Sequence, residues 1–349
     1  MIIGIDYRLA ASSHRGMGRY CREIVEKLFI MDTKNQYVLY IDDKCDKPLP
    51  HNFRFHKLPT SNFIIGEQII MPFFIIKDKI DVLWSPSNTF PLITPRHIKL
   101  VTTIHDLIFM YKLPKGQNFI QRVGALYRRY VLKLGHKRID SCITVSEFSA
   151  SEIKRIFNIT DVTITYNCIE AFYKKTKDIK QDKKENFYFT LSADAPSKNL
   201  KFLLEAFRNK LSGEKLIIAG VKDTSPLREL YSSQDITFLN DGISDDELIK
   251  LYMSCKAFIY VSLQEGFGIP PLEALSCGSK VICSYATSLR EVVGECGILI
   301  DPKNEDSLLK AISDIDNFDI TQEKIDLHLS QFIDWSVPAS IVLKTLTSK

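Results

Sequence analysis

Gln264-Glu265-Gly266-Phe267-Gly268-Ile269-Pro270-Pro271-Leu272-Glu273 is the stretch of this chain that says most about its fold. It follows the apolar run 257–262, whose β-branched and aromatic residues predict a buried strand. Pro270 and Pro271 suit the first turn of a helix, where backbone N–H groups need no intrahelical partner. The stretch therefore predicts a strand, a glycine loop and a helix in succession.

The glycine loop predicts a site for an anion. The backbone N–H groups of Gly266–Ile269 and the positive end of the helix are expected to face one point beyond the strand, where a diphosphate is favoured. Glu273, one turn into the helix, is placed to accept hydrogen bonds from a ribose diol, and Glu265 is placed beside a sugar. Together these features indicate a nucleotide-sugar site, with a solvated helix glutamate at 273 as the alternative.

Size and composition limit the class of protein. The 349 residues, 45% of them hydrophobic, can bury substantial cores, and their number favours two domains. Lys and Arg total 46 against 42 Asp and Glu, so the net charge of +4 is mild and predicts no nucleic-acid partner.

The cysteines and apolar runs bear on the compartment. The eight cysteines form no C-x-x-C pair, which favours a reducing compartment. The chain opens directly on a strand pattern at 2–6, without a basic leader. No uninterrupted apolar run reaches the roughly 20 residues of a membrane-spanning helix. We therefore expect a cytoplasmic protein, with peripheral attachment to the inner face of the cytoplasmic membrane as an extension.

Short apolar runs alternate with helical periodicity along the chain, which indicates a parallel α/β architecture with two lobes. In the first lobe we expect strands at 2–6, 37–41, 82–85, 100–104 and 142–145 and a helix at 19–29. In the second we expect strands at 187–191, 216–219, 257–261 and 281–283 and helices at 200–208 and 245–253.

One charged, core-poor stretch at 173–185 interrupts this alternation and cannot bury enough apolar surface to form a packed element. We therefore predict a first domain at 1–170, a linker at 171–185 and a second domain at 186–333. Because parallel sheets bind ligands at the carboxyl ends of their strands, two facing lobes are expected to enclose a cleft.

A glycine-rich segment follows the first expected strand. Gly16 and Gly18 precede the helix at 19–29 and are expected to form a turn that cradles phosphate. Cys21 stands where a dinucleotide fingerprint would have its third glycine, so that fingerprint is not predicted. A glycine turn without a ligand is the alternative.

Two further polar residues are candidates because they follow expected strands. His105 follows the strand ending at 104, where its imidazole can hydrogen-bond a sugar hydroxyl or carry developing charge. Lys198 lies just before the helix at 200–208, where its ammonium can meet a diphosphate. The alternatives are a structural histidine with satisfied hydrogen bonds and a solvated lysine.

Taken in order, these segments resemble the retaining glycosyltransferases of family 4, which have the GT-B fold of two Rossmann-like, doubly wound parallel-sheet domains facing across a cleft. The resemblance spans nearly the whole chain. It is carried by 16–20, 84–88, 103–106, 144–149, 196–200, 265–273, Cys277-Gly278 and 291–294. Within the family the sequence is most similar to bacterial enzymes that build O-antigen or capsular polysaccharide, many of which use GDP-mannose, an analogy at the level of the family.

The resemblance implies roles for the candidates. Glu273 would bind the donor ribose, Lys198 and the loop 266–269 the diphosphate, and His105 and Glu265 the donor sugar as the catalytic residues. Gly16 and Gly18 would close near the diphosphate and the acceptor. The acceptor would attack from the leaving-group face, and a diphosphate oxygen would take its proton. Neither a metal nor another cofactor is implied, in line with the lack of an Asp-x-Asp motif after an expected strand.

Two segments depart from the family pattern. Ser192-Ala193 stands where Gly-Arg often precedes the lysine, and Tyr166-Asn167-Cys168 replaces a more usual Pro-Asn-Gly. Because the first change removes a cation from the diphosphate site, Arg15 or Arg19 is the expected supporting cation. By the same resemblance, the segment 334–349 is expected to cross back onto the first lobe as a helix.

The segment 107–139 contains no Asp or Glu but many basic residues: Lys112, Lys115, Arg122, Arg128, Arg129, Lys133, Lys137 and Arg138. Its apolar residues recur at helical spacing and predict an amphipathic helix: Phe119, Val123, Leu126, Tyr127, Tyr130 and Leu134. The helix either faces an anionic membrane and a lipid-diphosphate acceptor or packs its apolar stripe into the first lobe.

The function that fits these features is transfer of a hexose from a nucleotide-diphosphate sugar, best GDP-mannose, to a growing polysaccharide or lipid-linked oligosaccharide acceptor. A transferase of the same fold that uses a UDP- or dTDP-sugar, or a non-catalytic partner subunit that binds sugar nucleotides, is the alternative. A nicotinamide-dependent oxidoreductase is disfavoured, because the first-lobe glycine loop has the wrong form for its cofactor.

Overall fold

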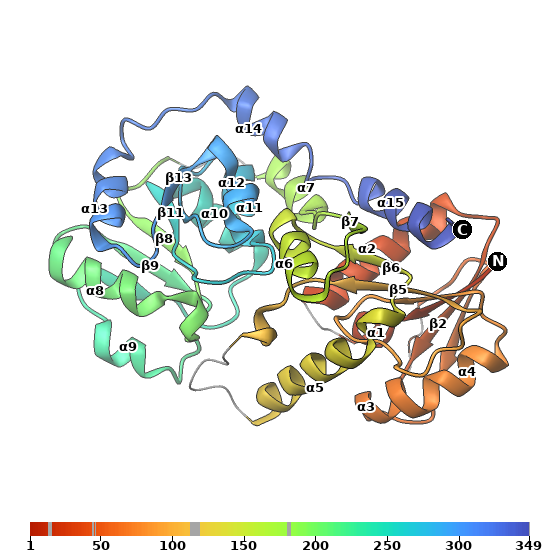
Figure 1. Ribbon diagram of the computed structural model, residues 1–349. Helices are drawn as coiled ribbons and strands as arrows, with labels where there is room; N and C mark the ends of the chain where they lie inside the picture. The colour runs from red at the N-terminus through yellow and green to blue at the C-terminus, as the bar shows by residue number, and fades with distance from the viewer. Residues whose placement is uncertain (13–15, 44, 46, 112–118, 180–182, 349) are drawn as a thin grey trace. The chain divides into compact units, whose positions relative to one another are not determined.

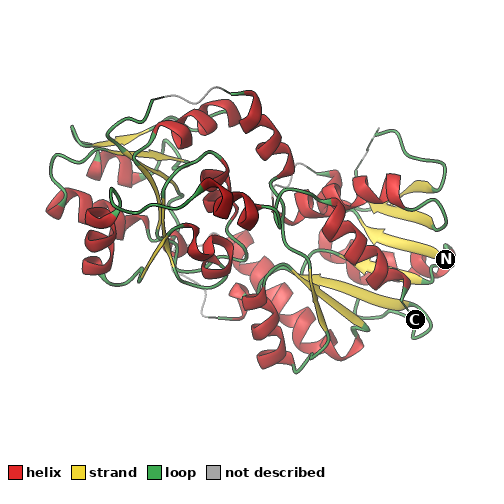
Figure 2. Ribbon diagram, turned by 90° about the horizontal axis from the view of Figure 1, so that it is seen from above, coloured by secondary structure: helices red, strands yellow, loops and turns green. Residues whose placement is uncertain are grey.

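The computed structural model describes residues 1–12, 16–43, 45, 47–111, 119–179 and 183–348, except for the side chains of 119–121. These residues divide into two units, the first formed by 1–111, 119–167 and 335–348 and the second by 168–334. Figures 1 and 2 show the strands of each unit flanked by helices.

The first unit contains a seven-stranded sheet in the order β3-β2-β1-β4-β5-β6-β7, and every pair of neighbours is parallel. Its strands are β1 (Ile2–Asp6), β2 (Gln36–Ile41), β3 (Phe53–Lys57), β4 (Val82–Ser85), β5 (Lys99–Ile104), β6 (Ser141–Thr144) and β7 (Val162–Ile164). The strand order reverses between β1 and β4. Such a switch point is where open parallel sheets bind ligands.

The helices of the first unit begin with α1 (Arg8–Ala11) and the amphipathic α2 (Gly16–Met31). They continue with α3 (Phe63–Ile65), the π-helix η1 (Gly66–Ile70), α4 (Met71–Lys77), η2 (Ile108–Met110), α5 (Phe119–Gly135), η3 (His136–Arg138) and α6 (Glu147–Phe157). The C-terminal α15 (Ser336–Thr347) packs on α2, where the rings of Trp335 and Tyr20 lie 6.0 Å apart. Lys99 Nζ donates a 2.7 Å hydrogen bond to the Thr345 carbonyl. The last helix is thus part of the first unit.

The second unit contains a six-stranded sheet in the order β10-β9-β8-β11-β12-β13, also with every neighbouring pair parallel. Its strands are β8 (Tyr188–Leu191), β9 (Leu216–Ala219), β10 (Ile236–Phe238), β11 (Ala257–Tyr260), β12 (Val281–Ser284) and β13 (Ile298–Ile300). The order reverses between β8 and β11, which gives this sheet a switch point of its own.

The longer amphipathic helices of the second unit, such as α8 and α13, bury one apolar face each, as their spacing of apolar residues predicts. The helices of this unit are α7 (Glu170–Asp178), η4 (Pro196–Lys198), α8 (Leu200–Lys210), α9 (Pro226–Tyr231), α10 (Asp245–Ser254), α11 (Ile269–Ser276), α12 (Leu289–Val293), η5 (Gly294–Cys296), α13 (Glu305–Asp314) and α14 (Gln322–Leu329). In α8, for example, Leu204 and Phe207 belong to the same buried cluster as Ile218 of β9 and Ile259 of β11. Two all-parallel sheets with reversing strand order confirm the predicted fold class.

The strands that the sequence analysis misses are β3, β7, β10 and β13, and all four lie at the edges of their sheets. Each is partly exposed, whereas β4, β11 and β12 are buried along their whole length. An edge strand has a neighbour on one side only, so it carries a weaker apolar signal than a central strand.

The charged stretch predicted as a linker at 171–185 also differs from expectation. Glu170–Asp178 form α7, whose Phe172 is 4% exposed and whose Thr176 is also buried. The Phe172 ring lies 6.2 Å from the ring of Tyr252 in α10. A few buried residues on one face are enough to dock this otherwise charged helix. Residues 180–182 of the predicted linker lie outside the described residues.

Candidate functional site

The glycine loop of the second unit leads from β11 into α11. Gly268 has a φ of +109°, in the left-handed region, and a Cβ atom there would lie 2.4 Å from Leu289 Cδ2. Only glycine fits such a position without strain. Ser288 Oγ donates a 2.8 Å hydrogen bond to the Phe267 carbonyl and so fixes the loop against the start of α12. The loop conformation is therefore set before any ligand arrives.

A charged cluster lies at the switch point of this sheet. Lys198, which ends η4 after β8, places its Nζ 2.7 Å from Glu265 Oε1. Tyr260, at the end of β11, donates a 2.7 Å hydrogen bond from its hydroxyl to the same carboxylate oxygen and accepts one of 3.0 Å from Lys198 Nζ. Burial, and next the charge of Glu265, hold the pKa of the Tyr260 hydroxyl well above its ordinary value. The structure thus brings predicted Lys198 and Glu265 together, and it contradicts the solvated alternative for Lys198.

The backbone of Glu265 is held as firmly as its side chain. Its N–H donates a 3.1 Å hydrogen bond to Thr287 Oγ1. Thr287 has a φ of +55°, an uncommon conformation for a β-branched residue. Backbone strain of this kind persists where the surrounding structure over-determines it, and it clusters at functional sites. Sequence reasoning missed both Thr287 and Tyr260, because a threonine in a turn and a tyrosine in a strand give no signal of their own.

Glu273 lies in α11, the helix that the glycine loop opens, and its side chain is 8% exposed. The alternative of a solvated helix glutamate is therefore wrong. The Glu273 carboxylate also affects Tyr252 of α10. Burial, and next the charge of Glu273, raise the pKa of the Tyr252 hydroxyl well above its ordinary value. The part of this buried carboxylate in ribose binding stays a prediction.

His105 lies at the end of β5 in the first unit and is 7% exposed. Its Nε2 donates a 2.8 Å hydrogen bond to the Pro86 carbonyl, because a carbonyl oxygen can only accept. Its backbone N–H donates to Asn88 Oδ1 at 2.6 Å, and its ring meets the Tyr20 ring edge-on at 4.9 Å. The imidazole is thus fixed in orientation, and its part in sugar binding stays a prediction.

The glycine segment of the first unit has a different form from the one predicted. Gly16 begins α2 and Gly18 is buried within it, so both glycines belong to the helix and not to a turn that precedes it. The helix thus begins at Gly16 and not at the predicted start, Arg19. Arg19 Nε lies 3.7 Å from Glu23 Oε1, and Arg15 lies outside the described residues.

A pocket of about 360 Å³ lies at the switch point of the first sheet. Leu9 follows β1, and Ser87 and Thr89 follow β4. Residues of α2, α3 and α5 complete the wall, namely Met17, Phe63, Ile64, Val123, Gly124, Tyr127 and Arg128. Sequence reasoning missed this pocket, since no single segment contributes more than four of its residues.

The exposure of α5 bears on the two interpretations of the basic segment 107–139, a membrane-facing helix or a helix packed into the first lobe. Val123, Leu126, Tyr130 and Leu134 of α5 are exposed, whereas Tyr127 of the same stripe packs on the core of the first unit. The stripe therefore packs into the first unit only in part. Two of the arginines serve the fold: Arg129 Nη2 donates to the Phe109 carbonyl and Arg138 Nη2 to the Ile98 carbonyl. Lys112 and Lys115 lie outside the described residues, as does the side chain of Phe119.

Two searches bear on metals and membranes. In the described ranges, no three His, Cys, Asp or Glu side chains gather as the ligands of a metal ion would. Within those same ranges, no helix combines the length and the apolar character needed to span a bilayer.

Comparison with known families places both halves of the chain. Residues 15–171 match the family described as Glycosyltransferase Family 4, and residues 172–326 match Glycosyl transferases group 1. O-antigen chain mannosyltransferase B from Escherichia coli is 28% identical over 332 residues, which cover 84% of each chain. O-antigen chain mannosyltransferase RfbU from Salmonella typhimurium is 28% identical over 256 residues, 70% of this chain and 67% of that one.

Among solved structures, Anabaena HepE in complex with UDP-glucose superimposes with a TM-score of 0.66 at 16% identity, covering 100% of this chain and 99% of that one. At this identity the likeness supports the fold, and glycosyltransferases of the GT-B fold are its neighbours. The two family matches, in the predicted order and joined at residue 171, cover most of the sequence. This chain belongs to the family 4, group 1 glycosyltransferases, and it is an enzyme of that class with the GT-B fold.

Proposed function

We propose that this glycosyltransferase moves a mannosyl group from GDP-mannose to a glycan or lipid-linked oligosaccharide acceptor during surface polysaccharide synthesis. The observation that carries the proposal is the Lys198–Glu265–Tyr260 cluster beside the glycine loop, at the carboxyl edge of the second sheet. Relatives named as O-antigen mannosyltransferases support the sugar and the process. The complex of HepE with UDP-glucose supports a nucleotide-sugar donor in general.

The cluster suits the stabilisation of a leaving diphosphate. The Lys198 ammonium now has one carboxylate oxygen and one hydroxyl as partners, and a donor diphosphate would become its third, oppositely charged partner. The N-terminus of α11 adds backbone N–H groups and the positive end of the helix dipole to the same region. Charge that develops on the diphosphate as the glycosidic bond breaks would be met by groups already in place.

Glu265 and Glu273 would bind the remaining parts of the donor, which are the sugar and the ribose. Glu265, held by Lys198 and Tyr260, would accept hydrogen bonds from sugar hydroxyls. Glu273 would accept from the ribose diol. Neither carboxylate is needed as a nucleophile, because the acceptor hydroxyl would attack from the leaving-group face and pass its proton to a diphosphate oxygen. The anomeric configuration of the sugar would then be retained.

In the first unit, His105 would act on the donor sugar through a ring whose Nε2 is already bonded to the Pro86 carbonyl. Gly16 and Gly18, at the start of α2, would offer backbone to the diphosphate and the acceptor. Arg19 is the supporting cation that the structure describes, and Glu23 is the ion-pair partner it would share with a ligand. No metal or other cofactor enters this scheme.

The exposed apolar side of the first unit supports peripheral attachment to a membrane. Leu126 and Tyr130 of α5 are 54% and 60% exposed, and Arg122 and Lys133 on the same helix are exposed cations. Ile69 of η1 and Phe73 of α4 are also exposed, at 65% and 63%. Exposed apolar groups flanked by cations suit the surface of an anionic bilayer.

Sedimentation with vesicles tests the membrane proposal. The protein should sediment with anionic vesicles and much less with neutral ones, and Leu126→Glu should reduce the bound fraction about fivefold. Leu327→Glu, at a 73% exposed leucine of α14 in the second unit, is the matched control and should change nothing. Equal sedimentation with both kinds of vesicle would contradict the proposal.

A thermal-shift panel tests the donor. GDP-mannose, UDP-sugars, dTDP-rhamnose and ADP-glucose would each be added to the wild type and to the Lys198→Ala and Glu273→Ala variants. Binding to the native state must raise its melting temperature. A shift with GDP-mannose that both substitutions abolish supports the proposal. A shift with UDP- or dTDP-sugars instead would reassign the donor, and no shift with any donor would contradict the proposal that this chain binds a nucleotide sugar by itself.

A further inference from the structure

We propose that Glu265 promotes release of the nucleoside diphosphate product by competing with it for the positive charge of Lys198, and that the sugar of the bound donor prevents this competition. The inference rests on the proposed function and concerns regulation of that same site. In the donor complex, sugar hydroxyls bind the Glu265 carboxylate and leave the ammonium charge to the diphosphate. Once the sugar has been transferred, the carboxylate is again balanced by Lys198 alone.

The geometry of the pair is the first argument. Lys198 Nζ lies 2.7 Å from Glu265 Oε1, and the Tyr260 hydroxyl donates a 2.7 Å hydrogen bond to the same oxygen. Among the described residues, the ammonium has no other anionic partner and Glu265 Oε2 has no hydrogen-bond partner. A lysine offers three N–H donors but a single positive charge. A diphosphate can therefore reach a free N–H of Lys198, but it has to share a charge that Glu265 already balances.

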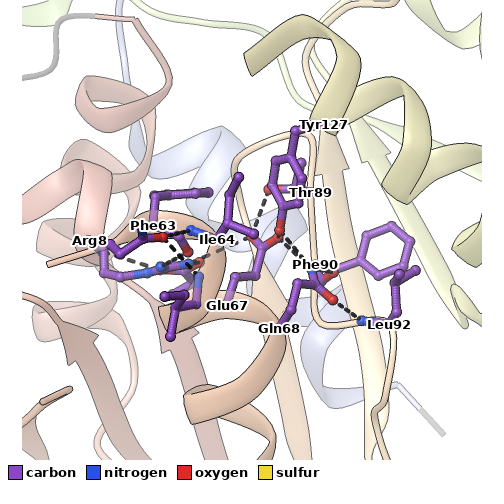
Figure 3. Close-up of polar contacts among 12 residues, drawn as sticks. Arg8, Phe63, Ile64, Glu67, Gln68, Thr89, Phe90, Leu92 and Tyr127 are labelled. Atoms are coloured by element: carbon purple, nitrogen blue, oxygen red, sulfur yellow. Dashed lines mark hydrogen bonds and ion pairs between the residues drawn. The ribbon is translucent and has the colours of Figure 1, made fainter. Parts of the chain in front are cut away.

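The exposure of the pair allows it to change partners. Its two side chains are 28% and 14% exposed. The charged pair of the first unit is different, because the side chains of Arg8 and Glu67 are 1% and 0% exposed. Figure 3 shows that the Glu67 carboxylate also accepts hydrogen bonds from the hydroxyls of Thr89 and Tyr127. A ligand can thus reach the pair of the second unit, whereas the buried pair serves the fold.

The backbone that carries the two charges is fixed, so a change of partners involves side chains alone. The Leu263 N–H donates a 2.7 Å hydrogen bond to the Ser197 carbonyl, which joins the loop after β11 to η4. The Glu265 N–H donates to Thr287 Oγ1 at 3.1 Å, and Ser288 Oγ donates to the Glu265 carbonyl at 3.3 Å. The ammonium and the carboxylate therefore stay within reach of each other.

The transfer reaction changes the charge that faces this carboxylate. In a nucleotide sugar the terminal phosphate is esterified, whereas in the free diphosphate it has a second ionisable oxygen with a pKa of about 6. Near neutral pH the product is therefore more negative than the donor, and it has lost the hydroxyls that bound the carboxylate. Like charges a few ångströms apart repel each other strongly near a protein surface. Glu265 consequently favours the donor through its sugar and disfavours the product.

The second unit contains a matched control with the same three residue types. Glu205 of α8 accepts a 3.3 Å hydrogen bond from the Tyr231 hydroxyl, and Lys201 Nζ lies 3.6 Å from the same oxygen. The side chains of Lys201 and Glu205 are 68% and 41% exposed, so solvent screens this pair. Glu205→Gln therefore makes the same chemical change outside the proposed site.

The experiment is a calorimetric titration of GDP and of GDP-mannose, without acceptor, into the wild type, Glu265→Gln and Glu205→Gln. Glu265→Gln should bind GDP about tenfold more tightly than the wild type, because the competing charge is gone. It should bind GDP-mannose no more tightly than the wild type, because it also loses a charged acceptor for the sugar hydroxyls. Glu205→Gln should leave both affinities within about twofold of the wild type.

A double-substitution cycle tests whether the competition acts through the lysine. In the Lys198→Ala background, Glu265→Gln should tighten GDP binding less than about threefold, because no ammonium is left to share. A full tenfold gain in that background would overturn the inference. Weaker or unchanged GDP binding by Glu265→Gln alone would also overturn it, since the carboxylate would then only hold Lys198 in place. An equal gain for GDP and GDP-mannose would do the same, because the sugar would have no effect on the competition.

The wild type separates these failures from failure of the proposed function. If it binds GDP and GDP-mannose but the variants respond with the wrong sign, the inference alone fails. If it binds neither, the proposed donor is wrong, and the same comparison is made with the nucleotide and nucleotide sugar that raise its melting temperature, for which the same signs are expected. A wild type that binds no nucleotide sugar overturns both proposals.

Discussion

The two sheets share one strand order around their switch points but place different chemistry there. In both, the strand order reverses next to the first strand of the unit, β1 in one sheet and β8 in the other. The second presents the Lys198–Glu265 pair, partly open to solvent, beside a glycine loop. The first presents an apolar pocket and buries its charges, Arg8 and Glu67, behind the pocket wall. The fold thus gives each unit a switch point, and the side chains there make the two regions chemically different.

The substitution with the largest expected effect disrupts the second region only. Lys198→Ala removes the cation placed for the diphosphate and should lower kcat/KM for transfer about a thousandfold, close to 4 kcal/mol of transition-state stabilisation. The melting temperature should change little, since the side chain is part-exposed. Lys201→Ala on α8, where the lysine is exposed and faces Glu205, is the control and should retain activity. A loss of less than threefold in Lys198→Ala would remove this lysine from the site.

The next largest effect is a loss of stability in the first region. Arg8→Met leaves the buried carboxylates of Asp6 and Glu67 without their cation, which should cost about 3 to 4 kcal/mol of unfolding free energy. Lys174→Met removes a cation from an exposed pair with Glu170 and should cost under about 1 kcal/mol. Urea denaturation measures both. Equal costs for the two variants would show that the buried network adds nothing beyond a surface pair.

A pH dependence sharpens the comparison further. Burial raises the pKa of Glu67 from an ordinary 4.5 to about 7, against the hydrogen bonds from Thr89 and Tyr127. Between these values the folded state holds a proton that the unfolded state has lost, so Glu67 makes the unfolding free energy fall as pH rises. The fall should total about 3 kcal/mol and should be missing in Glu67→Gln. Parallel pH profiles of the two proteins would show that the carboxyl is already ionised near pH 5.

The smallest effect concerns the glycine loop of the second region. Gly268→Ala and Gly278→Ala both place a Cβ at positive φ, at +109° and +71°. At 278 nothing lies within 4 Å, whereas at 268 the atom meets Leu289. Gly268→Ala should therefore be about 1 to 2 kcal/mol less stable than Gly278→Ala. Indistinguishable chemical denaturation curves would mean that the loop accommodates a Cβ atom at position 268 without loss of stability.

The same contrast explains how far the sequence alone could reach. The central strands and the loop 264–273 carry local signals, because an apolar run, a glycine pair and two prolines lie next to one another in the chain. Glu273 and the Lys198–Glu265 neighbourhood could therefore be predicted from strand ends. Tyr260 and Thr287 could not, since their importance comes from one hydrogen bond each to Glu265.

The first region shows where sequence reasoning stops. Its pocket joins residues as far apart as Leu9, Phe63, Thr89 and Gly124, and its wall depends on Glu67, which lies in a helix between two apolar runs. No local pattern marks such a site. Two local expectations also differ from the structure, because α2 already begins at Gly16 and because Phe172 and Thr176 pack part of the charged stretch 171–185 as α7.

The most direct test of where the donor binds is a calorimetric titration of GDP-mannose into the wild type, Glu273→Ala and Gly124→Leu. If the second unit holds the donor, Glu273→Ala should weaken donor binding about a hundredfold, and Gly124→Leu, a substitution in the first-unit pocket, should leave it unchanged. Donor binding that survives in Glu273→Ala, or that Gly124→Leu abolishes to the same extent, would contradict the division of labour between the two regions.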